Sequence, residues 1–222
     1  MGQQTEEATY YPQIFNSPSE FHAKGIILTP EGSQPTNERW IKETPYLIDL
    51  ILESVKLDEN SLVLDYGCGI GRLAKELIDR TNCKVIGVDI SLNMLEYAYA
   101  YVKSENFTGM SLKVFKHLVL NCPDFKFDLA LAVWVLQHCL EPDDDVGSIN
   151  ACLKTGAEFF VVNDLTRKVP TLERGWADDG LDIQEVIKEE NCFKELKKGQ
   201  LDPKIVPKEL HDNCFWGVYQ AT

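Results

Sequence analysis

One stretch of the chain, residues 62–77, constrains the fold more than any other, and it reads LVLDYGCGIGRLAKEL. Its first three residues are apolar, which is typical of a strand buried on both faces. Gly67, Gly69 and Gly71 follow on alternate positions, and leucines then recur at helical spacing. Glycine adopts positive φ angles at little cost and lets a ligand approach backbone N–H groups. The stretch therefore predicts a strand, a tight turn and a helix whose N-terminus meets a polar ligand.

The spacing of the glycines shows which nucleotide-binding motifs the sequence can and cannot match. A dinucleotide fingerprint that starts at Gly67 would need its third glycine at the position of Arg72. The phosphate-binding string G-x-x-x-x-G-K-[ST] does not occur in the sequence. The pattern present is D-x-G-x-G-x-G beginning at Asp65, and it resembles the first motif of class I S-adenosylmethionine-dependent methyltransferases. A glycine turn without a ligand is the alternative, but three alternating glycines carry a backbone entropy cost that a ligand site would explain.

A second buried-strand pattern, KVIGVDIS at residues 84–91, ends in an acid. Asp89 lies 18 residues after Gly71, near the spacing at which an acid binds ribose hydroxyls in a nucleotide site. A carboxylate can accept two hydrogen bonds from a vicinal diol. The resemblance implies this role for Asp89, with Ile90 against the adenine and Met94 one helical turn further on. The alternative is an acid favoured by a helix N-terminus.

The resemblance implies S-adenosylmethionine as the cofactor. Arg72 offers a planar fork that matches the cofactor carboxylate, although an exposed helix arginine is the alternative. The strand at 127–133 would end beside the methionine part, with Val133 where the family usually has a polar residue. Trp134 would shield the sulfonium or fill the core. The predicted cofactor-binding residues are Asp65, Gly67, Cys68, Gly69, Gly71, Arg72, Asp89, Ile90, Met94, Val133 and Trp134.

Charge and composition narrow the function. The 222 residues suit one sizeable α/β domain, and the net charge of −13 disfavours nucleic acid as a partner. The seven cysteines include no C-x-x-C pair, so neither a disulfide framework nor a metal site is predicted. No signal-peptide core and no 18-residue apolar run occurs, so we expect a cytoplasmic protein without a membrane partner. The oligomeric state is left open.

Strand and helix patterns alternate along the chain. Strands are predicted at 62–66, 84–88, 112–116, 127–133, 157–163, 193–201 and 214–220, and helices at 71–80, 91–103, 143–153 and 182–190. A further helix is predicted from Thr44 as cap and Pro45 as first helical residue. The fold class is therefore α/β, a doubly wound, Rossmann-like and mostly parallel seven-stranded sheet with helices on both faces and a C-terminal antiparallel strand.

The chain divides into two parts by composition. Residues 1–37 are polar and irregular but contain four aromatic residues, which argues that some of this segment packs. Residues 38–222 form a single domain that resembles the methyltransferase domain. The family resemblance implies that the N-terminal segment acts as a lid over the substrate. No acid follows the strand predicted at 112–116, so no partner is assigned to the adenine amino group.

The predicted function is methyl transfer from S-adenosylmethionine to a small-molecule acceptor. His138 and Asp164 follow strands whose carboxyl ends should face the reaction, and either is a candidate proton acceptor. A structural role is the alternative for His138, and Asp164 can instead orient Arg167 or the loop to Pro170. A peptide or protein N-terminal methyltransferase and a catalytically silent binding subunit remain open. The glycine spacing opposes a nicotinamide oxidoreductase.

Overall fold

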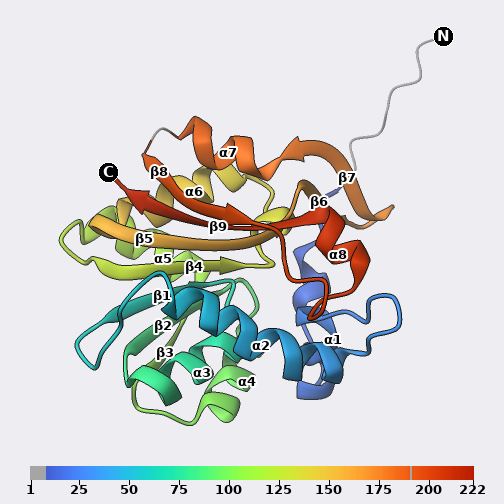
Figure 1. Cartoon of the computed structure of the whole chain (residues 1–222), viewed down its shortest axis with the longest axis horizontal. Helices are drawn as coiled ribbons and strands as arrows, with labels where there is room; N and C mark the ends of the chain where they lie inside the picture. Colours follow the sequence, from blue (N-terminus) through green and yellow to red (C-terminus); the bar gives the residue numbers. More distant parts are fainter. Residues whose placement is uncertain (1–8, 191) are drawn as a thin grey trace.

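A seven-stranded sheet organises the computed structural model, which describes residues 9–190 and 192–222 (Figure 1). The strand order is β3-β2-β1-β4-β5-β9-β8. The first five strands of this order are parallel, and β9 runs antiparallel to both β5 and β8. The strands are β1 (Leu62–Tyr66), β2 (Lys84–Asp89), β3 (Phe107–Ser111), β4 (Phe127–Val133), β5 (Leu153–Asp164), β8 (Phe193–Gly199) and β9 (Cys214–Ala221).

Helices cover both faces of the sheet, so the predicted doubly wound fold is confirmed. Successive strand residues point to opposite faces, and Val63 joins one apolar cluster while Leu64 joins the other. One face carries α2 (Thr36–Leu52), α3 (Arg72–Thr81) and α4 (Leu92–Val102), and the other carries α5 (Leu112–Asn121), α6 (Pro142–Ala151) and α7 (Ile183–Glu189). Burial on both faces explains why the central strands read as continuous apolar runs.

The strand predicted at 112–116 is wrong, because these residues begin helix α5. The third strand is β3, which pairs with β2 from Val85↔Phe107 to Asp89↔Ser111. The Ser111 side chain accepts a hydrogen bond from the Val114 N–H and starts the helix there. A short apolar run is compatible with either a strand or a helix. The Ser111 cap favours the helix here.

The start predicted for the helix before the glycine turn is also wrong. Helix α2 begins at Thr36, and Pro45 lies inside it rather than at its first position. Proline removes one N–H donor in a helix interior. The Thr44 hydroxyl donates to the Trp40 carbonyl at 2.6 Å, and upstream the Arg39 guanidinium pairs with Glu43 four residues on. These contacts support the additional N-terminal turns.

Several elements outside the sheet were not predicted. A two-stranded hairpin is formed by β6 (Thr166–Thr171) and β7 (Gly175–Asp182), and the N-terminal part contains η1 (Pro12–Phe15) and α1 (Glu20–Ile27). The remaining short elements are η2 (Leu136–His138) and α8 (Lys208–Asn213). Figure 1 shows α1, α8 and the β6–β7 hairpin gathered at one end of the sheet. Among the described residues, no helix combines the length and apolar character needed to span a bilayer.

Candidate functional site

A cavity of about 430 Å³ lies where the parallel strands end. Open α/β sheets bind ligands at this edge, and the volume is within the usual range for small-molecule sites. Nine of the predicted site residues line the cavity. They are Gly67, Gly69, Asp89, Ile90, Met94, Val133, Trp134, His138 and Asp164.

The glycine turn after β1 has the backbone that its sequence predicts. Gly67, Gly69 and Gly71 have φ angles of 73°, 54° and 77°, all in the left-handed region. A Cβ at Gly67 would lie 2.4 Å from Val135 Cγ2, and one at Gly69 would lie 2.6 Å from Ile27 Cδ1. Both the backbone conformation and the close neighbours therefore require glycine at these two positions of the cavity floor.

Asp89 links the end of β2 to the glycine turn. Its Oδ2 accepts a hydrogen bond from the Gly69 N–H at 2.8 Å, and its Oδ1 accepts one from the Ser91 N–H at 2.8 Å. Each oxygen keeps a lone pair for a further donor. Burial raises the pKa of Asp89 to about 6, while the hydrogen bonds from Ser91 and Gly69 act in the opposite direction. The carboxylate is thus fixed in orientation and remains ionised at neutral pH.

Four predicted cofactor residues do not line the cavity. Gly71 packs beneath helix α4, where an added Cβ would lie 2.5 Å from Val102 Cγ2. The Cys68 side chain is buried, and so is Asp65, whose Oδ2 has no hydrogen-bond partner within the described structure. Burial raises the pKa of Asp65 to about 7, although the nearby Arg72 charge opposes this. Asp65, Cys68 and Gly71 thus belong to the packing around the glycine turn and not to the cavity lining.

Arg72, predicted to bind the cofactor carboxylate, also lies outside the cavity lining. Its guanidinium is buried, donates to Thr44 Oγ1 at 3.2 Å and lies 5.7 Å from the centroid of the Trp40 ring. Arg39 lines the cavity instead, and it is bonded twice to the Glu43 carboxylate, at 2.5 and 3.1 Å. The geometry gives no support to a contact between Arg72 and a cofactor carboxylate. Trp40 lies on α2, and its ring packs edge-on against Tyr101 of α4, with the centroids 5.9 Å apart.

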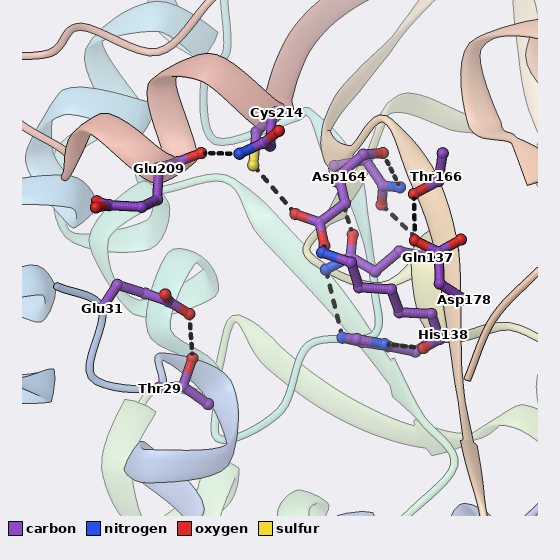
Figure 2. Close-up of polar contacts among 12 residues, drawn as sticks. Thr29, Glu31, Gln137, His138, Asp164, Thr166, Asp178, Glu209 and Cys214 are labelled. Carbon is purple, nitrogen blue, oxygen red and sulfur yellow. Dashed lines mark hydrogen bonds and ion pairs between the residues drawn. The ribbon is translucent and has the colours of Figure 1, made fainter. Parts of the chain in front are cut away.

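A hydrogen-bonded network joins the two candidate proton acceptors (Figure 2). His138 Nδ1 donates to the Lys168 carbonyl at 2.8 Å, and its Nε2 lies 3.3 Å from Gln137 Nε2. Gln137 Oε1 accepts from the Asp164 N–H at 3.2 Å. Burial lowers the pKa of His138, so the ring is neutral at physiological pH with its lone pair on Nε2.

Asp164 is an ion-pair partner in this network. One carboxylate oxygen lies 2.7 Å from Lys168 Nζ, and the other accepts a hydrogen bond from the Cys214 thiol at 3.1 Å. The alternative that Asp164 orients Arg167 is wrong, because Arg167 pairs with Asp179. Both oxygens of Asp164 therefore have partners, and the Nε2 lone pair of His138 accepts a hydrogen bond from the Gln137 amide at 3.3 Å.

The sequence did not single out several residues of the cavity wall. Tyr10 and Phe15 come from the N-terminal segment, Lys168 from β6 and Trp176 from β7. Tyr10 forms a bridge to Thr171, and this contact brings the N-terminal segment onto the hairpin. The four aromatic residues of the N-terminal segment predicted that part of it packs. The partners of Tyr10 and Phe15 are more than 100 residues away in the chain, so the sequence could not identify them.

Comparison with known families agrees with this geometry. Residues 63–156 match a family described as "Methyltransferase domain". A sterol 4-C-methyltransferase of Caenorhabditis elegans is 32% identical over 117 residues, which are 50% of this chain and 33% of that protein. A mitochondrial ubiquinone biosynthesis O-methyltransferase of Dictyostelium discoideum is 26% identical over 151 residues, covering 60% of this chain and 47% of the relative. The matches thus span a third to a half of these two relatives.

Solved structures show the same fold over most of the chain. A putative sarcosine dimethylglycine methyltransferase from Galdieria sulphuraria has a TM-score of 0.67 at 13% identity, covering 90% of this chain and 96% of its own. The cyclase SpnF has a TM-score of 0.65 at 18% identity, covering 96% and 97%. At these identities the likeness shows the fold alone.

Proposed function

Since the chain belongs to the class I S-adenosylmethionine-dependent methyltransferases, as its glycine motif predicted, we propose that it transfers a methyl group from this cofactor to a small-molecule acceptor. One observation carries the proposal. The Gly67–Gly69 turn and the Asp89 carboxylate, 20 residues apart, meet on one wall of a single cavity. The same cavity continues to a neutral histidine and a surface-reaching tryptophan.

The residues present fit the cofactor. A Cβ at Gly69 would project into tightly packed space, so the turn keeps its backbone close to the cavity. Asp89 would hold the ribose diol through its remaining lone pairs, and Ile90, Met94 and Val133 would provide apolar contact for the adenosine. When bound, the cofactor supplies a methyl group on a sulfonium, which is an excellent leaving group.

We assign the proton acceptor to His138. Its Nδ1–H is held by the Lys168 carbonyl, which leaves Nε2 as the basic nitrogen. A neutral imidazole accepts a proton readily near pH 7. Asp164 is the second candidate, but its ion pair with Lys168 favours a role in positioning.

A small molecule fits the cavity better than a folded peptide segment does. The N-terminal segment crosses the cavity, with Tyr10 and Phe15 in its wall. We propose that residues 9–35 serve as the lid and that the remainder of the chain forms a single catalytic domain. The first eight residues of the predicted lid lie outside the described residues. A peptide acceptor and a catalytically silent subunit are the competing functions.

Calorimetry and turnover test the proposal together. Asp89→Ala is expected to weaken binding of S-adenosylhomocysteine by at least tenfold, because up to two hydrogen bonds to a charged group are lost. Asp79→Ala, which removes an exposed acid of α3, is the matched control. Conversion of S-adenosylmethionine to S-adenosylhomocysteine with a small acceptor separates an enzyme from a silent subunit. Equal affinity of wild type and Asp89→Ala would contradict the assigned site.

Single-turnover rates assign the proton acceptor. A general base typically contributes 10²–10⁴-fold, so His138→Ala is expected to lose at least 100-fold at unchanged cofactor affinity. Asp164→Asn is expected to lose less, because the Lys168 partner and not a base is affected. The assignment to His138 is wrong if His138→Ala keeps a rate within a few-fold of wild type.

A further inference from the structure

Three aromatic rings from distant segments meet in one wall of the cavity. The ring centroids of His138 and Trp176 are 4.6 Å apart, and Phe15 lies 5.9 Å from His138 and 6.1 Å from Trp176. All three residues line the cavity. Trp176 is 46% exposed, so this aromatic wall extends from the interior to the mouth. An exposed tryptophan at a cavity rim is available to a ligand rather than needed by the core.

The cations of the cavity are already paired. Arg39 is bonded to Glu43 at 2.5 Å, Lys116 lies 3.0 Å from Asp145, and Lys168 lies 2.7 Å from Asp164. These are the Lys and Arg residues among the described lining residues. An anionic ligand would have to compete with an existing carboxylate for each of them. The cavity therefore disfavours an acceptor that carries a carboxylate or a phosphate.

Three lining acids lack a cation partner among the described residues, and one of them, Asp89, belongs to the proposed cofactor end of the cavity. Among the described residues, neither Glu31 nor Glu141 has a cation within ion-pair distance, and Glu31 accepts a hydrogen bond from the Thr29 hydroxyl at 2.9 Å. Figure 2 shows Glu31 across from His138 and Asp164. A cation that enters the cavity thus meets ring faces and uncompensated negative charge.

From this combination we propose that the methyl acceptor is an amine with an apolar substituent, bound as its cation at the wall of Phe15, His138 and Trp176 with Glu31 as counter-charge. This inference rests on the proposed methyltransferase function and names the substrate class of that site. Aromatic faces attract cations, and the attraction increases when water is excluded. An ammonium must lose a proton before its nitrogen can act as a nucleophile, and neutral His138 lies within the same wall. Its Nε2 can accept that proton once the Gln137 amide, which now donates to it, turns away.

Binding of unreactive probes tests the inference apart from activity. The probes are benzyltrimethylammonium, its neutral isostere neopentylbenzene, and benzoate, each titrated calorimetrically into protein saturated with S-adenosylhomocysteine. The cation is expected to bind at least tenfold more tightly than neopentylbenzene, and benzoate more weakly than both. Equal affinity for the cation and its neutral isostere, or tighter binding of benzoate, overturns the inference.

Variants identify the groups that recognise the cation. Trp176→Leu is expected to weaken cation binding about fivefold or more, while Trp176→Phe retains most of it. Glu31→Gln is expected to weaken binding of the cation and leave neopentylbenzene unaffected. Glu158→Gln is the matched control, because Glu158 is a half-buried acid outside the cavity. Unchanged cation affinity in both Trp176→Leu and Glu31→Gln contradicts the inference.

The cofactor-saturated state separates the two proposals. If S-adenosylhomocysteine itself fails to bind, the proposed function fails, whatever the probes do. If S-adenosylhomocysteine binds and the cation binds only the ligand-free protein, the rings serve the cofactor sulfonium and the amine inference alone is overturned. Cation binding on top of bound S-adenosylhomocysteine is the supporting result.

Discussion

The side chain of Gln137 lies between the two groups proposed for proton transfer. Its Oε1 accepts from the Asp164 N–H at 3.2 Å, which directs its Nε2 toward His138 Nε2 at 3.3 Å. Protonation of His138 would place two N–H donors against each other, because Lys168 already binds the other ring nitrogen. The groups near the ring also include the Asp164 and Lys168 charges and the Tyr10 hydroxyl, which donates to the His138 carbonyl. Gln137 thus favours the neutral ring.

Gln137→Glu is expected to raise the pKa of His138 by about one unit or more, because a carboxylate accepts a hydrogen bond from the protonated ring. Titration of the His138 ring proton by NMR measures this directly, without substrate. Gln137→Met, which removes the donor without adding charge, is the control and is expected to raise the pKa less. An unchanged pKa in Gln137→Glu would show that burial alone keeps the ring neutral.

Asp65 makes stability depend on pH. Burial raises its folded-state pKa to about 7, from an ordinary value of 3.8. Between these values the folded state holds a proton that the unfolded state has released, so this group lowers stability as pH rises from about 4 to about 7. Asp65→Asn removes the effect, and its stability relative to wild type is expected to increase with pH by at most about 4 kcal/mol.

Urea denaturation at pH 5, 6, 7 and 8 measures that difference for Asp65→Asn. The exposed acid variant Asp79→Asn is the control and is expected to show a constant offset. A stability difference that does not change with pH would mean that Asp65 is ionised in the folded protein throughout this range.

At the scale of elements, residues 11–16 of the N-terminal segment are held by a hydrogen bond at each end. At one end the Tyr11 N–H donates to the Pro170 carbonyl of β6 at 2.9 Å. At the other end Asn16 Oδ1 accepts from the Ser91 hydroxyl at the start of α4 at 2.9 Å. Phe15 lies between these anchors, Tyr10 lies next to one of them, and both line the cavity. We expect opening of either anchor to widen the entrance to the cavity.

Asn16→Ala removes a side-chain hydrogen bond of the α4 anchor. One such bond contributes about 0.5–1.5 kcal/mol, so opening is expected to become roughly two- to tenfold more frequent. Association and dissociation rates of S-adenosylhomocysteine, followed by stopped-flow tryptophan fluorescence, should both rise by this factor with little change in affinity. Asn106→Ala removes comparable bonds far from the cavity and serves as the control. Unchanged rates would show that the segment does not gate entry.

At the scale of the whole molecule, the cavity is lined by residues from several strands of the sheet, including β1, β2, β4 and β5. The two apolar clusters lie on opposite faces of the same strands, so loss of one exposes the other. We therefore expect a single cooperative thermal transition. S-adenosylhomocysteine at 100 times its dissociation constant should stabilise the folded state by about 2.7 kcal/mol. For a chain of this length that corresponds to a rise in Tm of roughly 5–11 °C, measurable by calorimetry.

The same titration in Asp89→Ala should give a much smaller rise at equal ligand concentration. A ligand-induced shift that persists in this variant would place the binding site elsewhere. Two separate transitions in the wild type would show that the β6–β7 hairpin or the N-terminal segment unfolds independently of the sheet.

The sequence by itself predicted most strands of the sheet and the glycine turn with Asp89, where we propose that the cofactor binds. Alternating glycines indicate a turn whose backbone needs positive φ angles, and Gly67 and Gly69 do adopt them. Apolar runs report burial on both faces, which is a property of each strand alone. Asp89 was found because its distance along the chain from the glycine turn is set by one helix and one strand. Each of these features depends on residues that are close together in the chain, so a local sequence pattern can predict it.

The tertiary structure decided which distant side chains meet. Phe15, His138 and Trp176 share a wall only because the N-terminal segment pairs with β6 and the hairpin folds back over η2. Arg72 lies 5.7 Å from the centroid of the Trp40 ring, and Trp40 belongs to α2 because that helix begins eight residues before its predicted cap. These outcomes depend on packing between elements that are far apart in the chain. Local periodicity contains no information about that packing. The sequence therefore could not predict the aromatic wall at which we propose that the methyl acceptor binds.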